Sequence, residues 1–208
     1  MESFESLGAN YATAIRLIDD AHSQDPNTIP GDSGPIPYEL HYARKMTRWL
    51  ASRKPDASPA LQLACRAQHF RRWELPRSSY PMTRAGYLTW RAKQKSQAAA
   101  QVAELLASSE IQPALARDEI ERVAALVRKE GLTKGDVETQ VLEDVACLVF
   151  LDDQFDGFEK KSEIDEEKVV GILRKTWAKM SEAGRKLALG MQLSERATGL
   201  IQKALSHN

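Results

Sequence analysis

Apolar residues recur at helical spacing along almost the whole chain, and this pattern restricts the fold more than any other feature. Phe4, Leu7, Tyr11, Ile15 and Ile18 fall on one face of a helix, and comparable faces recur in later segments. No segment keeps the two-residue alternation of a half-buried strand. The one β-leaning run, VACLVFL, is flanked by charged residues and fits a buried helix. The pattern therefore predicts an all-α fold.

Helix-starting and helix-breaking residues divide this pattern into segments. Ser58 is the expected N-cap of one helix, with Pro59 at its first position, and Thr83 is the expected N-cap of the next. Breaks are expected at the Pro/Gly-rich segment 23–37, at Pro55, at 75–81, at Gly131 and near 181–184. These signals predict seven to nine helices in a single compact domain over residues 1–208, with its core at about 19–189.

Composition excludes several classes of protein. The chain has 208 residues, 42% of them hydrophobic, which is enough for one domain with a core. Lys and Arg number 29, as do Asp and Glu, so the sequence is unlike a general nucleic-acid binder, although a local basic patch stays open. Cys65 and Cys147 lie within helical patterns, which favours buried thiols of a reduced, intracellular protein over a disulfide or a zinc pair.

The chain shows no targeting or membrane-spanning signal. Its start, MESFESLGAN, is acidic and amphipathic, whereas a signal peptide begins with basic residues and an apolar run. No apolar stretch approaches the ~20 residues that a membrane-spanning helix needs. We therefore expect a soluble, cytoplasmic protein without a membrane partner.

Arginines are concentrated beside aromatic residues in the run RAQHFRRWELPRSSYPMTRAGYLTWR. The set comprises Arg66, Arg71, Arg72, Arg77, Arg84 and Arg91. Guanidinium groups bind phosphate or carboxylate in a bidentate manner, so the run is a candidate phosphate clamp. The pattern predicts that the helix capped by Ser58 continues through His69 to Glu74, which places Arg66, His69 and Trp73 on one face.

This run also has a purely structural interpretation. Tyr80, Tyr87 and Trp90 could offer stacking surfaces to a ligand, but Trp73 and Trp90 are more often anchors of a core. The arginines could instead form salt bridges with carboxylates such as Glu39 and Glu74. Both interpretations stay open at this point.

A histidine and three carboxylates form a candidate metal site. The set is His69, Glu74, Glu143 and Asp144. Imidazole and carboxylate groups from different helices can hold a hard divalent ion, which lowers the pKa of bound water and polarises a phosphate oxygen. Taken singly, His69 also fits a hydrogen-bonded histidine at a helix interface, and the acidic pair fits an exposed helix start.

Four longer segments resemble one family. ELHYARKMTRWL, RAQHFRRWELPRSSYPMTRAGYLTWR, LEDVACLVFLDDQF and ILRKTWAKMS are similar to a family named domain of unknown function 4202, over about Asp19 to Leu189. That family in turn resembles HD-type metal-dependent phosphohydrolases, which are all-α. The resemblance implies an HD-like fold, with His69 as the first metal ligand and Asp144 as the last.

The sequence departs from that family at the expected middle ligands. Ala98 and Ala100 stand where the resemblance implies a histidine and a glutamate. Alanine binds no metal, so either His41 or Glu74 substitutes, or the chain has lost catalysis and kept a binding pocket. Because alanine favours helix, the fold should survive the change.

Two functional hypotheses follow, and a third is simpler. As a phosphohydrolase, the protein would hold a divalent metal with His69 and Asp144, and Glu74 or Glu143 would orient the water as the catalytic carboxylate. As a binding module, it would recognise a phosphorylated small molecule, a nucleotide or an RNA end without turnover. The expected ligand-binding residues in either case are Arg66, Arg72, Arg77, Arg84, Arg91, Trp73 and Tyr87. In the third hypothesis the charged cluster only holds helices together.

Overall fold

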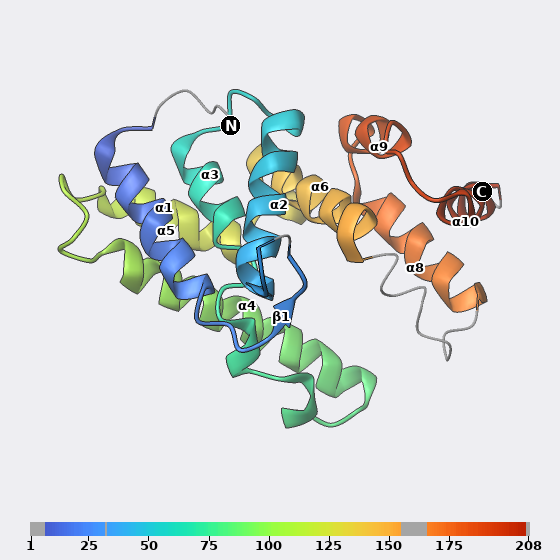
Figure 1. Ribbon diagram of the computed structural model, residues 1–208, viewed down its shortest axis with the longest axis horizontal. Coiled ribbons are helices and arrows are strands. Elements are labelled where there is room, and N and C mark those ends of the chain that lie inside the picture. Colours follow the sequence, from blue (N-terminus) through green and yellow to red (C-terminus); the bar gives the residue numbers. More distant parts are fainter. Residues whose placement is uncertain (1–6, 32, 155–165, 207–208) are drawn as a thin grey trace. The chain divides into compact units, whose positions relative to one another are not determined.

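The computed structural model describes residues 7–31, 33–154 and 166–206, and helices account for most of them (Figure 1). The all-α prediction is confirmed. The chain divides into two compact units, Met1–Leu142 and Glu143–Asn208. The division falls within the helix Val137–Val149. The expectation of a single domain stays a prediction.

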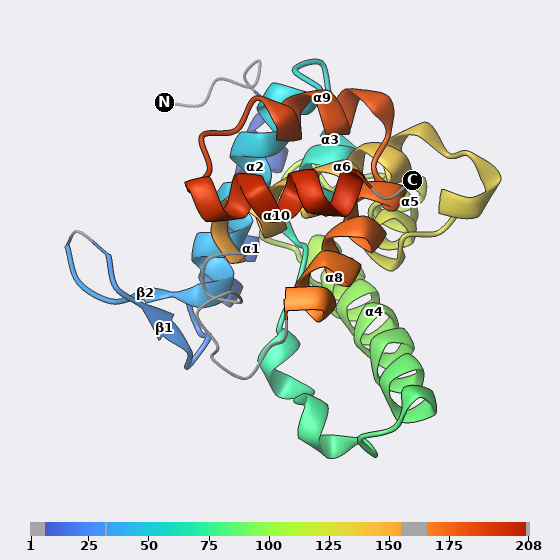
Figure 2. The same ribbon diagram turned by 90° about the vertical axis from the view of Figure 1, so that its right-hand side faces the viewer.

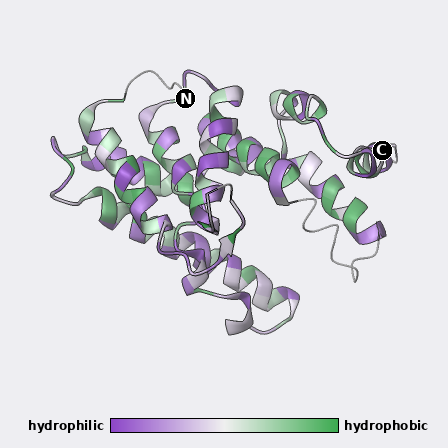
Figure 3. Ribbon diagram, viewed as in Figure 1, coloured by the Kyte–Doolittle hydropathy of each residue, from purple (hydrophilic) through white to green (hydrophobic). Residues whose placement is uncertain are grey.

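The first unit is built from helices that bury one face each. They are α1 (Ala9–His22), α2 (Tyr38–Arg53), α3 (Pro59–Arg66), α4 (Arg84–Leu106), α5 (Arg117–Arg128) and the start of α6 (Val137–Val149). α1, α2 and α3 pack side by side, and α5 packs on both α3 and α4 (Figure 1). Hydrophobic and hydrophilic residues share each of these helices, as Figure 3 shows. Ile18, Met46, Leu61 and Leu126 are fully enclosed in the resulting core.

The predicted helix starts are confirmed. The Ser58 hydroxyl accepts the backbone N–H of Leu61 at the start of α3, with Pro59 at the first helical position. The Thr83 hydroxyl accepts the N–H of Gly86 at the start of α4. A polar side chain at each start thus satisfies a backbone donor that the helix itself leaves unpaired.

The segment 23–37, expected as a loop, contains two short strands. β1 (Thr28–Ile29) pairs with β2 (Ile36–Pro37) in an antiparallel arrangement, and β2 leads directly into α2 (Figure 2). Two-residue strands are too short to show an alternating pattern in the sequence.

The prediction of one helix through His69 to Glu74 is wrong. α3 ends at Arg66, and a turn follows in which His69 (φ 64°) and Arg71 (φ 47°) take left-handed backbone conformations. A short 3-10 helix, η1, covers Arg72–Glu74. Arg66, His69 and Trp73 therefore do not share a helix face.

A buried carboxylate holds this turn against α2. Glu39 Oε1 accepts the backbone N–H of Arg72 at 2.6 Å, and Oε2 accepts that of Arg71 at 2.9 Å. His22 Nδ1 lies 3.1 Å from the same Oε2, and His22 Nε2 lies 3.0 Å from the carbonyl oxygen of Arg66. Hydrogen bonds thus hold the turn before His69 through His22 of α1 and after it through Glu39 of α2.

The second unit is held by a pair of packed helices. Its elements are the end of α6, the π-helical turn η4 (Phe150–Gln154), α8 (Glu166–Lys179), α9 (Glu182–Leu189) and α10 (Glu195–Leu205). α8 packs on α10, which buries Leu173 and Leu200. VACLVFL is helical, as predicted, and the expected break near 181–184 is confirmed because α8 ends at Lys179 and Ser181 caps α9.

Changing Glu39 to glutamine should destabilise the protein. The amide NH₂ of a glutamine would face a backbone N–H, so one of the two turn donors would lose its acceptor in a buried place. Such a loss costs about 1–3 kcal/mol of unfolding free energy. Urea unfolding followed by circular dichroism measures it, and Glu104→Gln, at an exposed position of α4, is the control. Equal stabilities of the two variants would contradict the assignment.

Candidate functional site

The turn after α3 presents His69 as a neutral imidazole. Its ring stacks on that of Tyr42, with centroids 4.1 Å apart and 16° between the planes. Arg72 Nη1 lies 3.0 Å from His69 Nε2. A guanidinium group can only donate, so Nε2 accepts, and the ring proton belongs on Nδ1. Burial, together with the charges of Arg72 and Arg91, holds the pKa of His69 well below its usual range.

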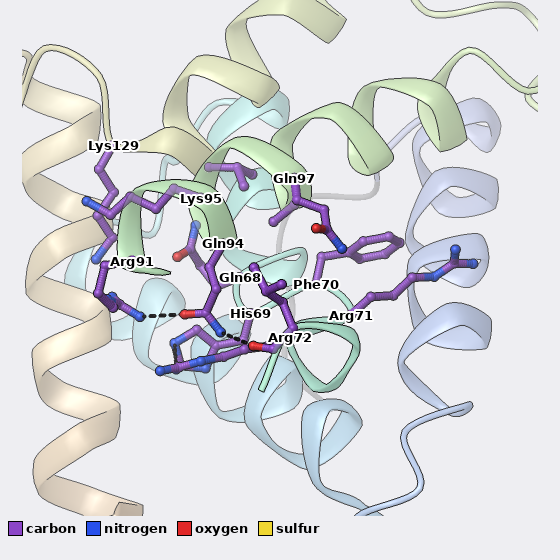
Figure 4. Close-up of a pocket in the computed structure, with 13 residues that line it drawn as sticks. Gln68, His69, Phe70, Arg71, Arg72, Arg91, Gln94, Lys95, Gln97 and Lys129 are labelled. Atoms are coloured by element: carbon purple, nitrogen blue, oxygen red, sulfur yellow. Dashed lines mark hydrogen bonds between the residues drawn. The ribbon is translucent and has the colours of Figure 1, made fainter. Parts of the chain in front are cut away.

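A small pocket opens beside this imidazole, and we name it the cationic pocket (Figure 4). Its inner volume is about 50 Å³. It is lined by Gln68, His69, Phe70, Arg71, Arg72, Leu75, Arg91, Gln94, Lys95, Gln97, Ala98, Val127 and Lys129. No Asp or Glu occurs among these described lining residues, so every permanently charged side chain in the wall is a cation.

Four of these cations lie on one side of the pocket. Figure 4 shows Arg72, Arg91, Lys95 and Lys129 on the same side as His69, whereas the guanidinium of Arg71 extends away from them. Burial, followed by the charge of Arg91, lowers the pKa of Arg72. Gathering like charges in a place that is partly closed to water creates a strong attraction for an anion.

Trp90 holds the arginines in place. Its indole N–H donates to the Leu75 carbonyl at 2.9 Å, and Trp90 is buried at the start of α4. The guanidinium carbons of Arg72, Arg77 and Arg91 lie 5.4, 5.8 and 5.8 Å from the indole ring centroid. At these distances the ring attracts each cation through its π-electrons, which offsets part of the repulsion among them.

Both pocket arginines keep donors for a ligand. Arg72 makes one hydrogen bond to a described side chain, His69, and Arg91 makes one, to Gln94 Oε1 at 3.3 Å. A guanidinium carries five N–H donors, so most donors of Arg72 and Arg91 are not used by hydrogen bonds to described side chains. A forked, cationic donor is suited to the oxygens of a phosphate group.

The structure places the other predicted ligand-binding residues elsewhere. Arg66 forms a two-fold salt bridge with Asp19, at 2.6 Å for both nitrogens, and also bonds Thr47, so it joins α3 to α1 and α2. Arg77 donates to the carbonyls of Tyr80 and Pro81. The remaining three lie as follows: Arg84 and Tyr87 are exposed on α4, and Trp73 lines a neighbouring cavity.

The predicted carboxylates each bond to other side chains. Glu74 accepts from the amides of Gln97 and Gln101. In the second unit, Glu143 lies 3.7 Å from Lys179 Nζ, and buried Asp144 accepts the backbone N–H of Ser181 at 2.7 Å and its hydroxyl at 2.5 Å. His69 and Asp144 belong to different units, so their approach to one ion stays a prediction.

The residues around His69 do not fit a divalent metal. Among the described residues, no three His, Cys, Asp or Glu side chains gather closely enough to hold an ion. The lone pair of His69 Nε2 accepts from Arg72, and the charged neighbours in the pocket wall are cations. A divalent cation would be repelled where a phosphate would be attracted.

Sequence reasoning missed several residues of the pocket. Gln94, Lys95 and Lys129 line it, and Ala98 lies in the wall beside them. Arg91, Gln94, Lys95 and Ala98 follow helical spacing on α4, which was a signal in the sequence for one shared face. Lys129 carried no such signal, because it reaches the pocket from a left-handed residue at the end of α5.

Comparison with known proteins gives the family of the chain. The family described as a domain of unknown function (DUF4202) matches residues 12–201. The chain belongs to this family. No curated protein and no solved structure matches it. Among the described residues, no helix is both long and apolar enough to cross a membrane.

Removing His69 should change how stability depends on pH. Because the folded-state pKa is lowered, the unfolded chain binds a proton below about pH 6.5 that the folded protein does not, so stability is lost as the pH falls. In His69→Asn, whose side chain tolerates the left-handed backbone, this acid-dependent loss should disappear. Wild type should therefore exceed the variant by more at about pH 7.5 than at about pH 5. Chemical unfolding at both pH values, with His41→Asn as control, measures this; a constant difference contradicts it.

Asp144 should behave as a cap of α9. Asp144→Asn should lower stability by about 1–3 kcal/mol, since an amide cannot accept at both oxygen positions. Ser181→Ala should weaken the same helix start, and the two changes combined should cost less than their sum because they break one interaction. Hydrogen exchange of the α9 amides measures both effects, with exposed Glu182→Gln as control. Protection that instead rises with added Mn²⁺ and falls with a chelator would assign Asp144 to a metal.

Proposed function

We propose that this protein recognises a phosphorylated small molecule, and that its phosphate group binds in the cationic pocket. One observation carries the proposal: a pocket whose described wall contains four cations on one side and no carboxylate. Arg72 and Arg91 offer forked donors, and Lys95 and Lys129 add compact positive charges.

The dimensions of the pocket suit one phosphate group. A water molecule needs about 10–15 Å³ of cavity volume, so about 50 Å³ holds the equivalent of roughly three to five water molecules. Four oxygens around one phosphorus fall within that range. The amides of Gln68, Gln94 and Gln97 can complete the hydrogen bonds of the phosphate oxygens.

The proposal concerns recognition and assigns no reaction step to a metal. The HD-type resemblance implies a phosphohydrolase, but alanine stands at both expected middle ligand positions and the donor set around His69 does not fit a divalent ion. Recognition without turnover is therefore the function that the site supports best. Soluble, cytoplasmic phosphate esters are the ligand class that we infer.

Removal of one pocket charge should weaken phosphate binding. Arg91→Gln should reduce the affinity for ribose 5-phosphate about 10- to 100-fold, because a charge-assisted hydrogen bond contributes about 1.5–3 kcal/mol. The matched control is Arg84→Gln, on the same helix but exposed outside the pocket. Isothermal titration calorimetry with ribose 5-phosphate and with inorganic phosphate measures the change, with and without a chelator.

Three results would contradict the proposal. Equal effects of the two arginine substitutions would remove the pocket from the binding site. Loss of binding on addition of a chelator would show that a metal ion takes part in binding. Steady release of inorganic phosphate from ribose 5-phosphate, absent in Arg91→Gln, would make the protein an enzyme.

A further inference from the structure

A second cavity adjoins the cationic pocket, and we name it the aromatic chamber. The two share His69, Arg72, Leu75 and Gln94 in their walls. The aromatic chamber has a volume of about 260 Å³, roughly five times that of the cationic pocket. A ligand that occupies both cavities would pass beside Arg72, which lines each of them.

Aromatic side chains form much of the wall of this chamber. Tyr38, Trp73 and Trp90 line it. The Trp90 ring already has three guanidinium groups beside it, and its N–H is bonded to Leu75. Trp73 differs, because it is only half-buried and its indole N–H bonds to no described residue. Trp73 thus offers both a ring and a hydrogen-bond donor to a ligand.

The chamber's acidic side chains are already engaged in hydrogen bonds. Asp25 accepts the backbone N–H groups of Asn27 and Glu39, at 2.9 and 3.0 Å. Glu39 accepts those of Arg71 and Arg72, and Gln94 bonds to Leu75 and Arg91. A ligand rich in hydroxyls would lose its bonds to water here without gaining enough new ones. A flat aromatic ring needs few hydrogen bonds and gains from stacking.

We propose that the ligand is a phosphate monoester that carries a flat aromatic ring, with its ring against Trp73 in the aromatic chamber and its phosphate in the cationic pocket. This rests on the proposed function, because it takes the phosphate position from it. Arg72, which lines both cavities, lies alongside the bond that joins the two parts of the ligand.

Three phosphate esters test the ring and its distance from the phosphate. Ribose 5-phosphate has no aromatic ring, adenosine 5′-monophosphate has a ring beyond a ribose, and pyridoxine 5′-phosphate has a ring one carbon from the ester oxygen. By calorimetry, at least one ring-bearing ester should bind about tenfold tighter than ribose 5-phosphate, or more. Whichever ring-bearing ester binds more tightly identifies the distance between ring and phosphate that the two cavities accommodate.

Substitution of Trp73 isolates the contribution of the chamber. Trp73→Leu should remove the affinity advantage of the ring-bearing ester and leave the binding of inorganic phosphate, which needs only the cationic pocket, unchanged within about twofold. Tyr87→Leu is the control, since Tyr87 is an exposed aromatic residue outside both cavities. Quenching of tryptophan fluorescence by the ring-bearing ester should diminish in Trp73→Leu only.

The outcomes separate the two proposals. If all three esters bind equally, with Arg91 dependence, the aromatic ligand is excluded and phosphate recognition stands. If adenosine or pyridoxine binds as tightly as its phosphate ester, the monoester proposal is overturned together with the phosphate position. If no ester binds, the proposed function fails first.

Discussion

The carboxylate of Glu39 is the group on which the site depends. It accepts the backbone N–H groups of Arg71 and Arg72 and thereby joins the start of α2 to the turn that carries His69. Burial raises the pKa of Glu39, while His22 and the backbone N–H of Arg72 oppose that rise by favouring the carboxylate. Because His22 Nε2 faces a carbonyl, which can only accept, it must carry a proton, and a further proton lies between His22 Nδ1 and Glu39. A buried polar cluster of this kind is stable only when every member has a partner, so it specifies one conformation of the turn.

That conformation brings cations together at an energetic cost. His69 and Arg71 occupy left-handed backbone positions, which cost about 1–3 kcal/mol each in residues other than glycine. Arg72 and Arg91 both lie beside the Trp90 ring although their charges repel each other. The ring and the acceptor nitrogen of His69 offset only part of that repulsion. Backbone strain and like-charge crowding at one place are costs that a chain keeps where binding requires them. Arg66 shows no such crowding of like charges, because its own charge is paired with that of Asp19.

The helices could be predicted from the sequence, whereas the turn could not. Ser58 and Thr83 cap helices because a hydroxyl at those positions satisfies a local donor, and local signals are what a sequence shows directly. Nothing within RAQHFRRWE ends a helix after Arg66, since the acceptor that captures the backbone is Glu39, 32 residues earlier than Arg71. The residues of the site divide in the same way, into those that the sequence predicts and those that only tertiary packing places. Arg72 and Arg91 were predicted beside His69 from residue type, but Lys129 enters through tertiary packing and Arg66 is lost to a salt bridge.

Ala98 connects the family resemblance to the proposed chemistry. The resemblance implies a metal-binding histidine at this position, and Ala98 indeed lies in the wall of the cavity that His69 lines. A divalent ion neutralises a phosphate by supplying positive charge at short range, and it requires anionic or neutral ligands around it. Arg72, Arg91, Lys95 and Lys129 supply positive charge to the same space from the protein itself. In the described wall this positive charge comes from side chains, and cations so placed oppose the approach of a metal ion. With alanine at position 98, the described residues of this wall include no second His, Cys, Asp or Glu beside His69, and the charged side chains near Ala98 are cations of the kind that bind phosphate directly.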